Sequence, residues 1–197
     1  VEGYERAVSQ RDAAETAQAD QNDRTTTQEL RDHATALFHE GKYQLALADA
    51  ERLLELEPDD FAGHYMAGWI YGTCPDPACR DKEKALFHAT KAVDLWLEAV
   101  PGTEPTYWMA WACLAAAHAE RGDFEKAIEY QKKAIEWLPA VAEEWRPSVE
   151  PRVKACLLLY EARKPLRSKA MSLGRLSDAW LESMSNENPE EFPEIAE

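Results

Sequence analysis

The feature of this chain that most constrains its fold is an internal repeat. Three landmarks recur at a separation of 81 residues: Gly41 and Gly122, Ala46 and Ala127, and Pro58 and Pro139. A third copy lies between the outer two, with its alanine at Ala85. Repetition of this kind predicts small helical units that stack on their neighbours, because one unit alone cannot bury its apolar face.

The alanine of each copy begins an apolar stripe with helical spacing. Successive members are separated by one, three, three and one residues, which places all five on one face of a helix. The stripes are Ala46, Leu47, Ala50, Leu53 and Leu54; Ala85, Leu86, Ala89, Ala92 and Val93; and Ala127, Ile128, Gln131, Ala134 and Ile135. We expect each first alanine to lie at a close helix crossing, where a larger side chain costs about 1–3 kcal/mol. The glycines are expected to end the preceding helices in a left-handed conformation.

Residues 27–139 resemble the tetratricopeptide repeat (TPR) family. The third copy carries the pattern most fully, with Trp111, Leu114, Ala115, His118, Gly122, Phe124, Ala127, Ala134 and Pro139. The first copy keeps Ala34, Leu37, Gly41, Tyr43, Ala46, Ala50, Leu53 and Pro58, and the second keeps Gly68, Tyr71, Ala85, Ala89 and Ala92. The second copy departs from the pattern by an inserted corner around Cys74 and a long exit through Pro101-Gly102.

This resemblance implies an all-α fold, a right-handed superhelix of three helix pairs followed by C-terminal capping helices. The repeats are expected at about 27–60, 61–104 and 108–141, and a capping helix at 148–162 would complete a TPR domain over residues 27–165. The residues that the family pattern assigns to repeat packing are Gly41, Ala46, Pro58, Gly68, Ala85, Trp111, Gly122, Ala127 and Pro139.

A narrower resemblance joins the chain to a bacterial subgroup of TPR proteins. It lies in Cys74-Pro75-Asp76-Pro77, in residues 114–120 and in residues 159–165. Such repeats are often attached to larger signalling or membrane-anchored chains, sometimes a Ser/Thr kinase. The resemblance therefore leaves the location open between the bacterial cytoplasm and the extracytoplasmic side of a membrane-anchored protein.

The segments outside the repeats differ in composition. Residues 1–26 are polar and predict a linker helix, and residues 186–197 carry five glutamates and two prolines, which is typical of a disordered tail. Residues 166–185 predict an amphipathic helix with the stripe Leu173, Leu176, Trp180 and Met184. This helix is expected either to extend the solenoid or to fold back into its groove, with an unstructured segment as the third alternative.

Charge and hydropathy exclude several classes of function. The chain has 22 basic and 37 acidic residues and a net charge of −15, whereas nucleic-acid binding needs a basic face. The same charge disfavours anionic lipid. No apolar run approaches the roughly 18–20 residues of a spanning helix. We expect neither nucleic-acid binding nor direct membrane insertion.

No set of residues in the sequence predicts catalysis. The five histidines form no spacing typical of a nucleophile with its base, and no glycine-rich phosphate loop is present. Cys74 and Cys79 leave three alternatives open: a metal site with His64 or His88, a disulfide, or simply a tight corner between helices. A second tight ligand pair is missing, so we expect no metal, no cofactor and no enzymatic activity.

The predicted function is protein–protein interaction through a concave groove. The resemblance implies that the first helix of each repeat lines this groove, with Arg31, Thr35 and Phe38 in the first repeat, Tyr65 and Trp69 in the second, and Met109, Ala112 and Ala116 in the third. In TPR proteins that clamp a carboxylate, Lys, Asn and Arg occupy positions held here by Thr35, Met66, Met109 and Cys113. An apolar, aromatic groove suits a hydrophobic or amphipathic helix.

Alternatives to this function remain. Tyr65 and Trp69 can instead pack between helices, without touching a partner. The chain can also be the accessory or regulatory region of a larger signalling enzyme, or it can self-associate through its repeat surfaces.

Overall fold

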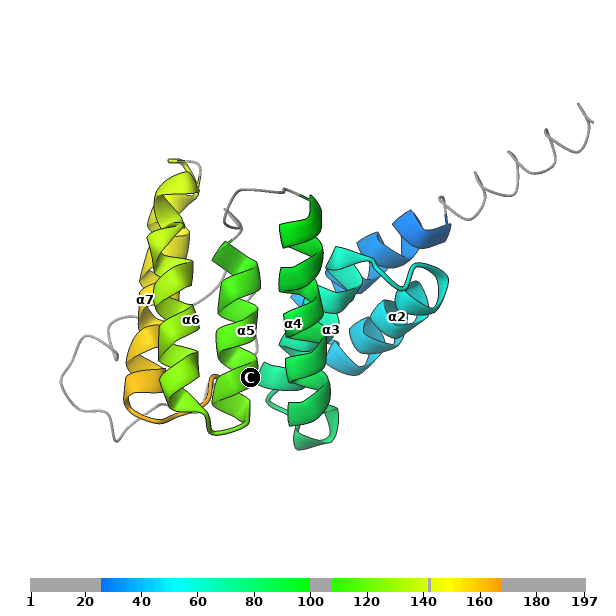
Figure 1. Cartoon of the computed structure of the whole chain (residues 1–197). Coiled ribbons are helices and arrows are strands. Elements are labelled where there is room, and N and C mark those ends of the chain that lie inside the picture. Colours follow the sequence, from blue (N-terminus) through cyan, green and yellow to red (C-terminus); the bar gives the residue numbers. More distant parts are fainter. Residues whose placement is uncertain (1–25, 100–107, 142, 168–197) are drawn as a thin grey trace, which may run out of the picture.

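A computed structural model describes residues 26–99, 108–141 and 143–167, and these residues form an all-α helical-repeat solenoid (Figure 1). The predicted linker helix, most of the amphipathic helix, the acidic tail and the exit through residues 101–102 lie outside the described residues. The elements in order are a first helix described over 26–39, α2 (Tyr43–Leu56), α3 (Phe61–Thr73), the short 3-10 helix η1 (Pro77–Cys79), α4 (Lys82–Ala99), α5 (Trp108–Glu120), α6 (Phe124–Glu136), the 3-10 helix η2 (Leu138–Ala140) and α7 (Arg146–Glu161). From α2 to α7, each α-helix packs on its neighbours along the chain, and α3 also packs directly on α5.

Two of the helices end in the same glycine turn. Gly41 and Gly122 have φ values of 75° and 83°, which glycine adopts without a Cβ penalty. Gly41 N–H donates to the Phe38 carbonyl at 3.1 Å, and Gly122 N–H donates to the Ala119 carbonyl at 3.0 Å. With the bonds from the following residue, these contacts form a Schellman ending. The 81-residue spacing in the sequence therefore reflects two copies of one turn.

The last described helix ends in the same way without a glycine. Arg163 N–H donates to the Tyr160 carbonyl at 3.0 Å, and Lys164 N–H donates to the Leu159 carbonyl at 2.9 Å. Arg163 has a φ of 54°, a conformation that costs a residue with a side chain about 1–2 kcal/mol. The turn directs the chain after α7 back toward α3 and α5.

The alanine stripes lie in the interior, as the spacing predicts. Ala46, Ala85 and Ala127 are all fully buried. One close crossing is at Gly68 in the middle of α3, where an added Cβ would lie 2.8 Å from the backbone nitrogen of Ala89. Small residues on both helices allow this approach, and it fixes α3 against α4 and α5.

Aspartates start several of the helices. The Asp60 carboxylate accepts the Gly63 N–H at 2.7 Å at the start of α3, and Asp81 accepts the N–H groups of Glu83 and Lys84 at 3.0 Å at the start of α4. These bonds satisfy backbone donors that the helix itself leaves free, and replacing such a cap typically costs about 1 kcal/mol.

The solenoid is covered at its far end by α7, which packs on α6. Its buried residues include Val149, Val153, Cys156 and Tyr160. Gln131, a polar member of the third stripe, is also buried and donates through Nε2 to the Val153 carbonyl at 2.7 Å. A side-chain bond to the backbone thus joins the last repeat to the helix that covers it.

Candidate interaction surface

An aromatic ladder runs along α3. Phe61, Tyr65 and Trp69 are spaced one turn apart, with ring centroids 6.1 Å apart in the first pair and 6.2 Å in the second. Trp69 is only 1% exposed, whereas Phe61 and Tyr65 are partly buried and pack on the core. The Trp96 ring of α4 lies 5.9 Å from Phe61. The ladder is therefore buried at Trp69 and partly exposed to solvent at Phe61.

The groove residues of the third repeat lie on α5, beside this ladder. Cys113 Sγ lies 3.6 Å from the Tyr65 carbonyl oxygen, so the two helices touch at this level. Met109 lies one turn before Cys113 and is partly buried, while Ala112 and Ala116 are buried. The two alanines thus serve the packing of α5, whereas Met109 is the predicted residue of this helix that stays partly exposed, one turn before the contact between Cys113 and Tyr65.

The first repeat contributes differently. Arg31 Nε donates to Asp60 Oδ2 at 2.8 Å, and its guanidinium also binds Glu57, so this cation joins the first helix to the turn before α3. Phe38 is buried against the edge of the Tyr43 ring, and Thr35 is exposed. The three predicted groove residues of this repeat therefore do not share one surface. The cation among them, Arg31, is already paired with Glu57 and Asp60.

We use the name aromatic surface for Phe61, Tyr65 and Met109, with Trp69 beneath them. Phe61 was not among the residues predicted from the sequence, although its position one turn before Tyr65 is a helical signal that could have found it. Of the eight predicted groove residues, Tyr65 and Trp69 are in ring contact here, and Met109 lies one helical turn before Cys113, which contacts the Tyr65 carbonyl.

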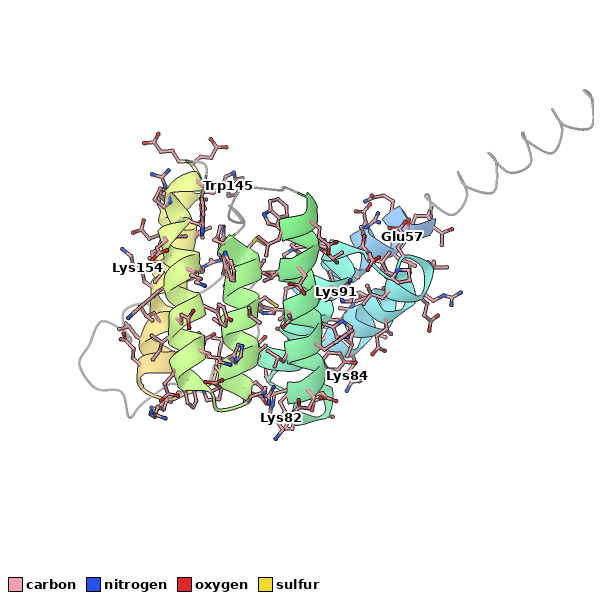
Figure 2. All side chains as sticks on the ribbon, in the orientation of Figure 1. Glu57, Lys82, Lys84, Lys91, Trp145 and Lys154 are labelled. Atoms are coloured by element: carbon pink, nitrogen blue, oxygen red, sulfur yellow. The ribbon has the colours of Figure 1, made fainter. Side chains whose placement is uncertain are left out.

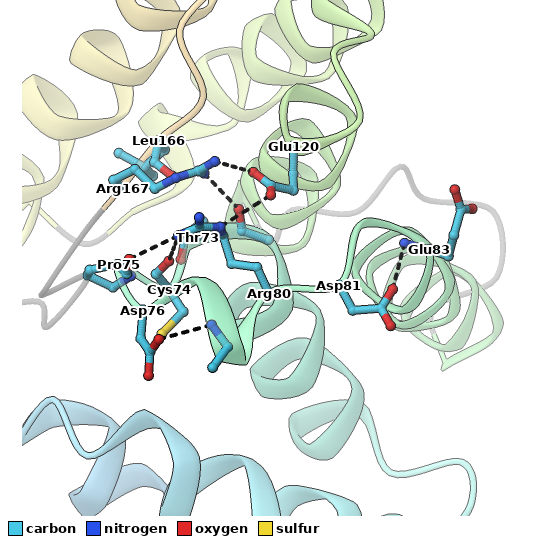
Figure 3. Close-up of polar contacts among 12 residues, drawn as sticks. Thr73, Cys74, Pro75, Asp76, Arg80, Asp81, Glu83, Glu120, Leu166 and Arg167 are labelled. Carbon is cyan, nitrogen blue, oxygen red and sulfur yellow. Dashed lines mark hydrogen bonds and ion pairs between the residues drawn. The ribbon is translucent and has the colours of Figure 1, made fainter.

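A charged junction occupies the other end of α3 and α5 (Figure 3). The Glu120 carboxylate is bound by two arginines: Arg167 Nη2 lies 2.6 Å from Oε2, and Arg80 Nε lies 3.4 Å from Oε1. Arg80 Nη1 also donates to the carbonyls of Cys74 and Pro75, at 2.8 and 2.9 Å. The Glu120 side chain is only 13% exposed, so the attraction is weakly screened.

The charged junction joins three segments that are distant in the sequence. Arg167 Nη1 lies 3.5 Å from the Gly72 carbonyl, and the neighbouring Leu166 is buried. The chain after α7 therefore returns to the carboxyl ends of α3 and α5, whose dipoles favour cations. The sequence offers no signal for this contact, because the three charged residues share no local spacing. Residues 168–185, which were predicted to fold back or to extend the solenoid, lie outside the described residues.

The outward face of α4 is charged (Figure 2). Lys84 and Lys91 lie on this face, on the side of the helix opposite Lys82, and Lys91 forms an ion pair with Asp59 at 2.9 Å. The same helix carries Phe87, which is 63% exposed. Phe87 is therefore an exposed aromatic side chain on α4 that is not part of the aromatic ladder of α3.

His64 and His88, which one of the alternatives for Cys74 and Cys79 names as metal ligands, contact each other. His64 Nε2 lies 2.9 Å from the Pro58 carbonyl oxygen and must carry a proton to bond it. His64 Nδ1 lies 2.9 Å from His88 Nδ1, so one of these two nitrogens donates to the other. Burial, and next the neighbouring His64, lower the pKa of His88 to about 4. The His88 ring is therefore neutral at pH 7.

Cys74 and Cys79 are both buried free thiols. Among the residues that the structure describes, no group of three or more histidine, cysteine or carboxylate side chains is placed to hold a metal ion. Within the same residues, no helix has both the length and the apolar character to cross a bilayer.

Comparison with known proteins addresses the third repeat directly. Residues 108–140 match the family model of the tetratricopeptide repeat. The matched segment comprises α5, the Gly122 turn and α6, and it coincides with the copy in which the sequence pattern is fullest. A search of curated proteins found no match to the chain. The TPR match supports the family assignment and a general role in protein–protein interaction.

Proposed function

We propose that this chain is a non-catalytic TPR adaptor that binds a hydrophobic or amphipathic helix of a partner protein on its aromatic surface. The observation that carries the proposal is the stacked Phe61–Tyr65 pair, 6.1 Å between ring centroids, held at the surface over buried Trp69. Large, rigid aromatic side chains lose little conformational entropy on binding and dominate many interfaces. Met109 widens the surface with a side chain that adapts to different apolar shapes.

The side chains of the aromatic surface and its surroundings favour an apolar partner over an acidic peptide tail. A carboxylate clamp needs free cations, but Arg31 is engaged by Glu57 and Asp60. Met66 and Cys113, which stand at clamp positions, are buried. A helix that presents an apolar stripe would bury its own side chains against Tyr65 and Met109 while its polar face stays in water.

Site-specific photocrosslinking in cells tests this proposal. A photoreactive phenylalanine analogue is placed in the full chain at Tyr65 or Met109, and at Phe87 as a matched control on the charged outward face of α4. We expect the same proteins to crosslink to the analogue at Tyr65 and at Met109, and not at Phe87. Crosslinking from Met109 should be lost when Tyr65→Glu is added and retained when Phe87→Glu is added. Equal capture at all three positions would contradict a specific aromatic surface.

The motif Cys74-Pro75-Asp76-Pro77 favours an alternative, in which the chain is the regulatory region of a larger bacterial signalling enzyme. The aromatic surface would then bind a segment of the same polypeptide. The gene sequence around Val1 distinguishes this arrangement from a separate adaptor. Self-association through the repeat surfaces is tested by light scattering over a range of protein concentrations.

A further inference from the structure

Two cysteines stand on either side of the corner that joins α3 to α4. Cys74 follows the last residue of α3 and donates its N–H to the Ile70 carbonyl at 3.0 Å. Cys79 ends η1 and donates its N–H to the Asp76 carbonyl at 3.1 Å. The Asp76 side chain holds the corner by accepting the Ala78 N–H at 2.9 Å. The backbone of the corner thus returns on itself and brings the two side chains to the same place.

Both thiols line one cavity of about 360 Å³ between this corner and the start of α2. Cys74 and Cys79 are 1% and 5% exposed. Tyr43 and Leu45 form part of the opposite wall, and Leu45 is itself largely exposed, as is Asp76. The cavity therefore leads from solvent to a pair of thiols that are otherwise enclosed.

The surroundings distinguish the two thiols. Burial raises the pKa of Cys74 to about 12, and a hydrogen bond between the side chains of Cys74 and Cys79 adds to the increase. Cys79 Sγ also lies 4.0 Å from Asp76 Oδ2. Cys74 is therefore protonated and a poor first nucleophile at neutral pH, because the thiolate is the reactive form.

We propose that Cys74 and Cys79 are a redox pair, which a low-molecular-weight disulfide entering this cavity oxidises to an intramolecular disulfide. The reaction has two exchange steps. In the first, the Cys79 thiolate attacks one sulfur of the small disulfide, forms a mixed disulfide and releases one small thiol. In the second, Cys74 attacks the Cys79 sulfur, breaks the mixed disulfide and releases the second small thiol. The two cysteines lose two electrons and two protons, and the oxidant becomes two thiols.

The remaining cysteines provide an internal control. Cys113 and Cys156 are buried, and neither lines the cavity. Burial raises the pKa of Cys156 to about 12 and raises that of Cys113 as well. Oxidation through the cavity must therefore spare both, whereas oxidation of an unfolded chain would not distinguish among the four.

The test treats the native full chain with oxidised glutathione, at the lowest concentration that oxidises the same chain unfolded in urea. The sample is then denatured, alkylated and analysed by mass spectrometry. We expect two of the four thiols to escape alkylation and the protein to lose two hydrogen atoms. Proteolysis on the amino side of Asp76 separates the two cysteines, so the linked peptides identify the bond.

Single variants assign the two roles. In Cys74→Ala, we expect a stable glutathione adduct on Cys79, because the resolving thiol is gone. In Cys79→Ala, we expect neither an adduct nor a disulfide. Three results in the wild-type chain would each overturn the proposal without any variant: four alkylated thiols, a glutathione adduct on Cys79 that never closes, or a disulfide that includes Cys113 or Cys156.

Discussion

Replacing Gly68 with alanine tests the close packing on which the centre of the solenoid depends. The new Cβ would lie 2.8 Å from the Ala89 backbone nitrogen and 3.2 Å from both the Ala89 Cα and the Cys113 sulfur. Ordinary contact begins at 3.4 Å, so α3 and α4 must separate by about 0.6 Å. The Cys113 side chain can turn aside, but the backbone of α4 cannot.

Gly72 on the same helix is the matched control. A Cβ there would meet its nearest neighbour, the Ala117 nitrogen, at 3.6 Å, which is ordinary van der Waals contact. Both substitutions gain the same helix propensity, about 1 kcal/mol, because alanine loses less backbone entropy than glycine. Gly68→Ala alone adds an overpacking cost of about 1–3 kcal/mol. The difference in unfolding free energy between the variants therefore isolates the packing cost.

Urea denaturation followed by circular dichroism measures this difference. We expect Gly72→Ala to match or exceed the wild type and Gly68→Ala to be about 1–3 kcal/mol less stable than Gly72→Ala. Each kcal/mol corresponds to about 2–4 °C in Tm for a chain of this size. Equal urea midpoints for the two variants would show that α3 and α4 do not approach as closely as the structure places them.

Three further outcomes are expected from stability measurements. Ala127→Leu should lower the unfolding free energy by about 1–3 kcal/mol, because Ala127 is fully buried at a helix crossing, and an unchanged urea midpoint would refute that register. Arg163→Gly should be more stable than Arg163→Ala by about 1 kcal/mol in the same assay, since only glycine relieves the strain at a φ of 54° and both variants lose the exposed ion pair with Glu125. The pKa of His88 in the folded protein is about 4, below its usual 6.5, so between these pH values the unfolded chain binds a proton that the folded chain does not. The unfolding free energy should therefore fall as the pH drops from about 6.5 to about 4. Between about pH 7 and about pH 4.5, His88→Gln should lose less unfolding free energy than the wild type.

The repeat architecture follows from local rules, which explains why the sequence predicts it. The turn after each of two helices requires a left-handed glycine, and each close helix crossing requires an alanine. Because every repeat places its turn and its crossing at the same positions, these residues recur at fixed spacing. The turn after α7 shows the limit of this reasoning. Its hydrogen bonds are those of the glycine turns, but Arg163 stands at the left-handed position, and no residue pattern marks it.

The interaction surface is less predictable because it depends on how closely the helices approach. The family register indicates which residues face the concave side, and it includes Trp69, Ala112 and Ala116. Direct packing of α3 on α5 buries all three, whereas Tyr65 and Met109 stay partly exposed. The distance between two helices depends on side chains far apart in the sequence, so the register alone does not separate a groove residue from a core residue.

The two ends of α3 and α5 therefore differ in chemistry, and the difference bears on how a partner would bind. At their carboxyl ends, Arg80 and Arg167 neutralise Glu120, and the site is filled by the chain's own cations. At their amino ends lies the aromatic surface, whose members are uncharged aromatic and thioether side chains. Because α3 has 13 residues and rises about 1.5 Å per residue, the ends are roughly 18 Å apart. A partner helix can thus reach Tyr65 without displacing Arg167, so the proposed adaptor function does not require the ion pair between Arg167 and Glu120 to break.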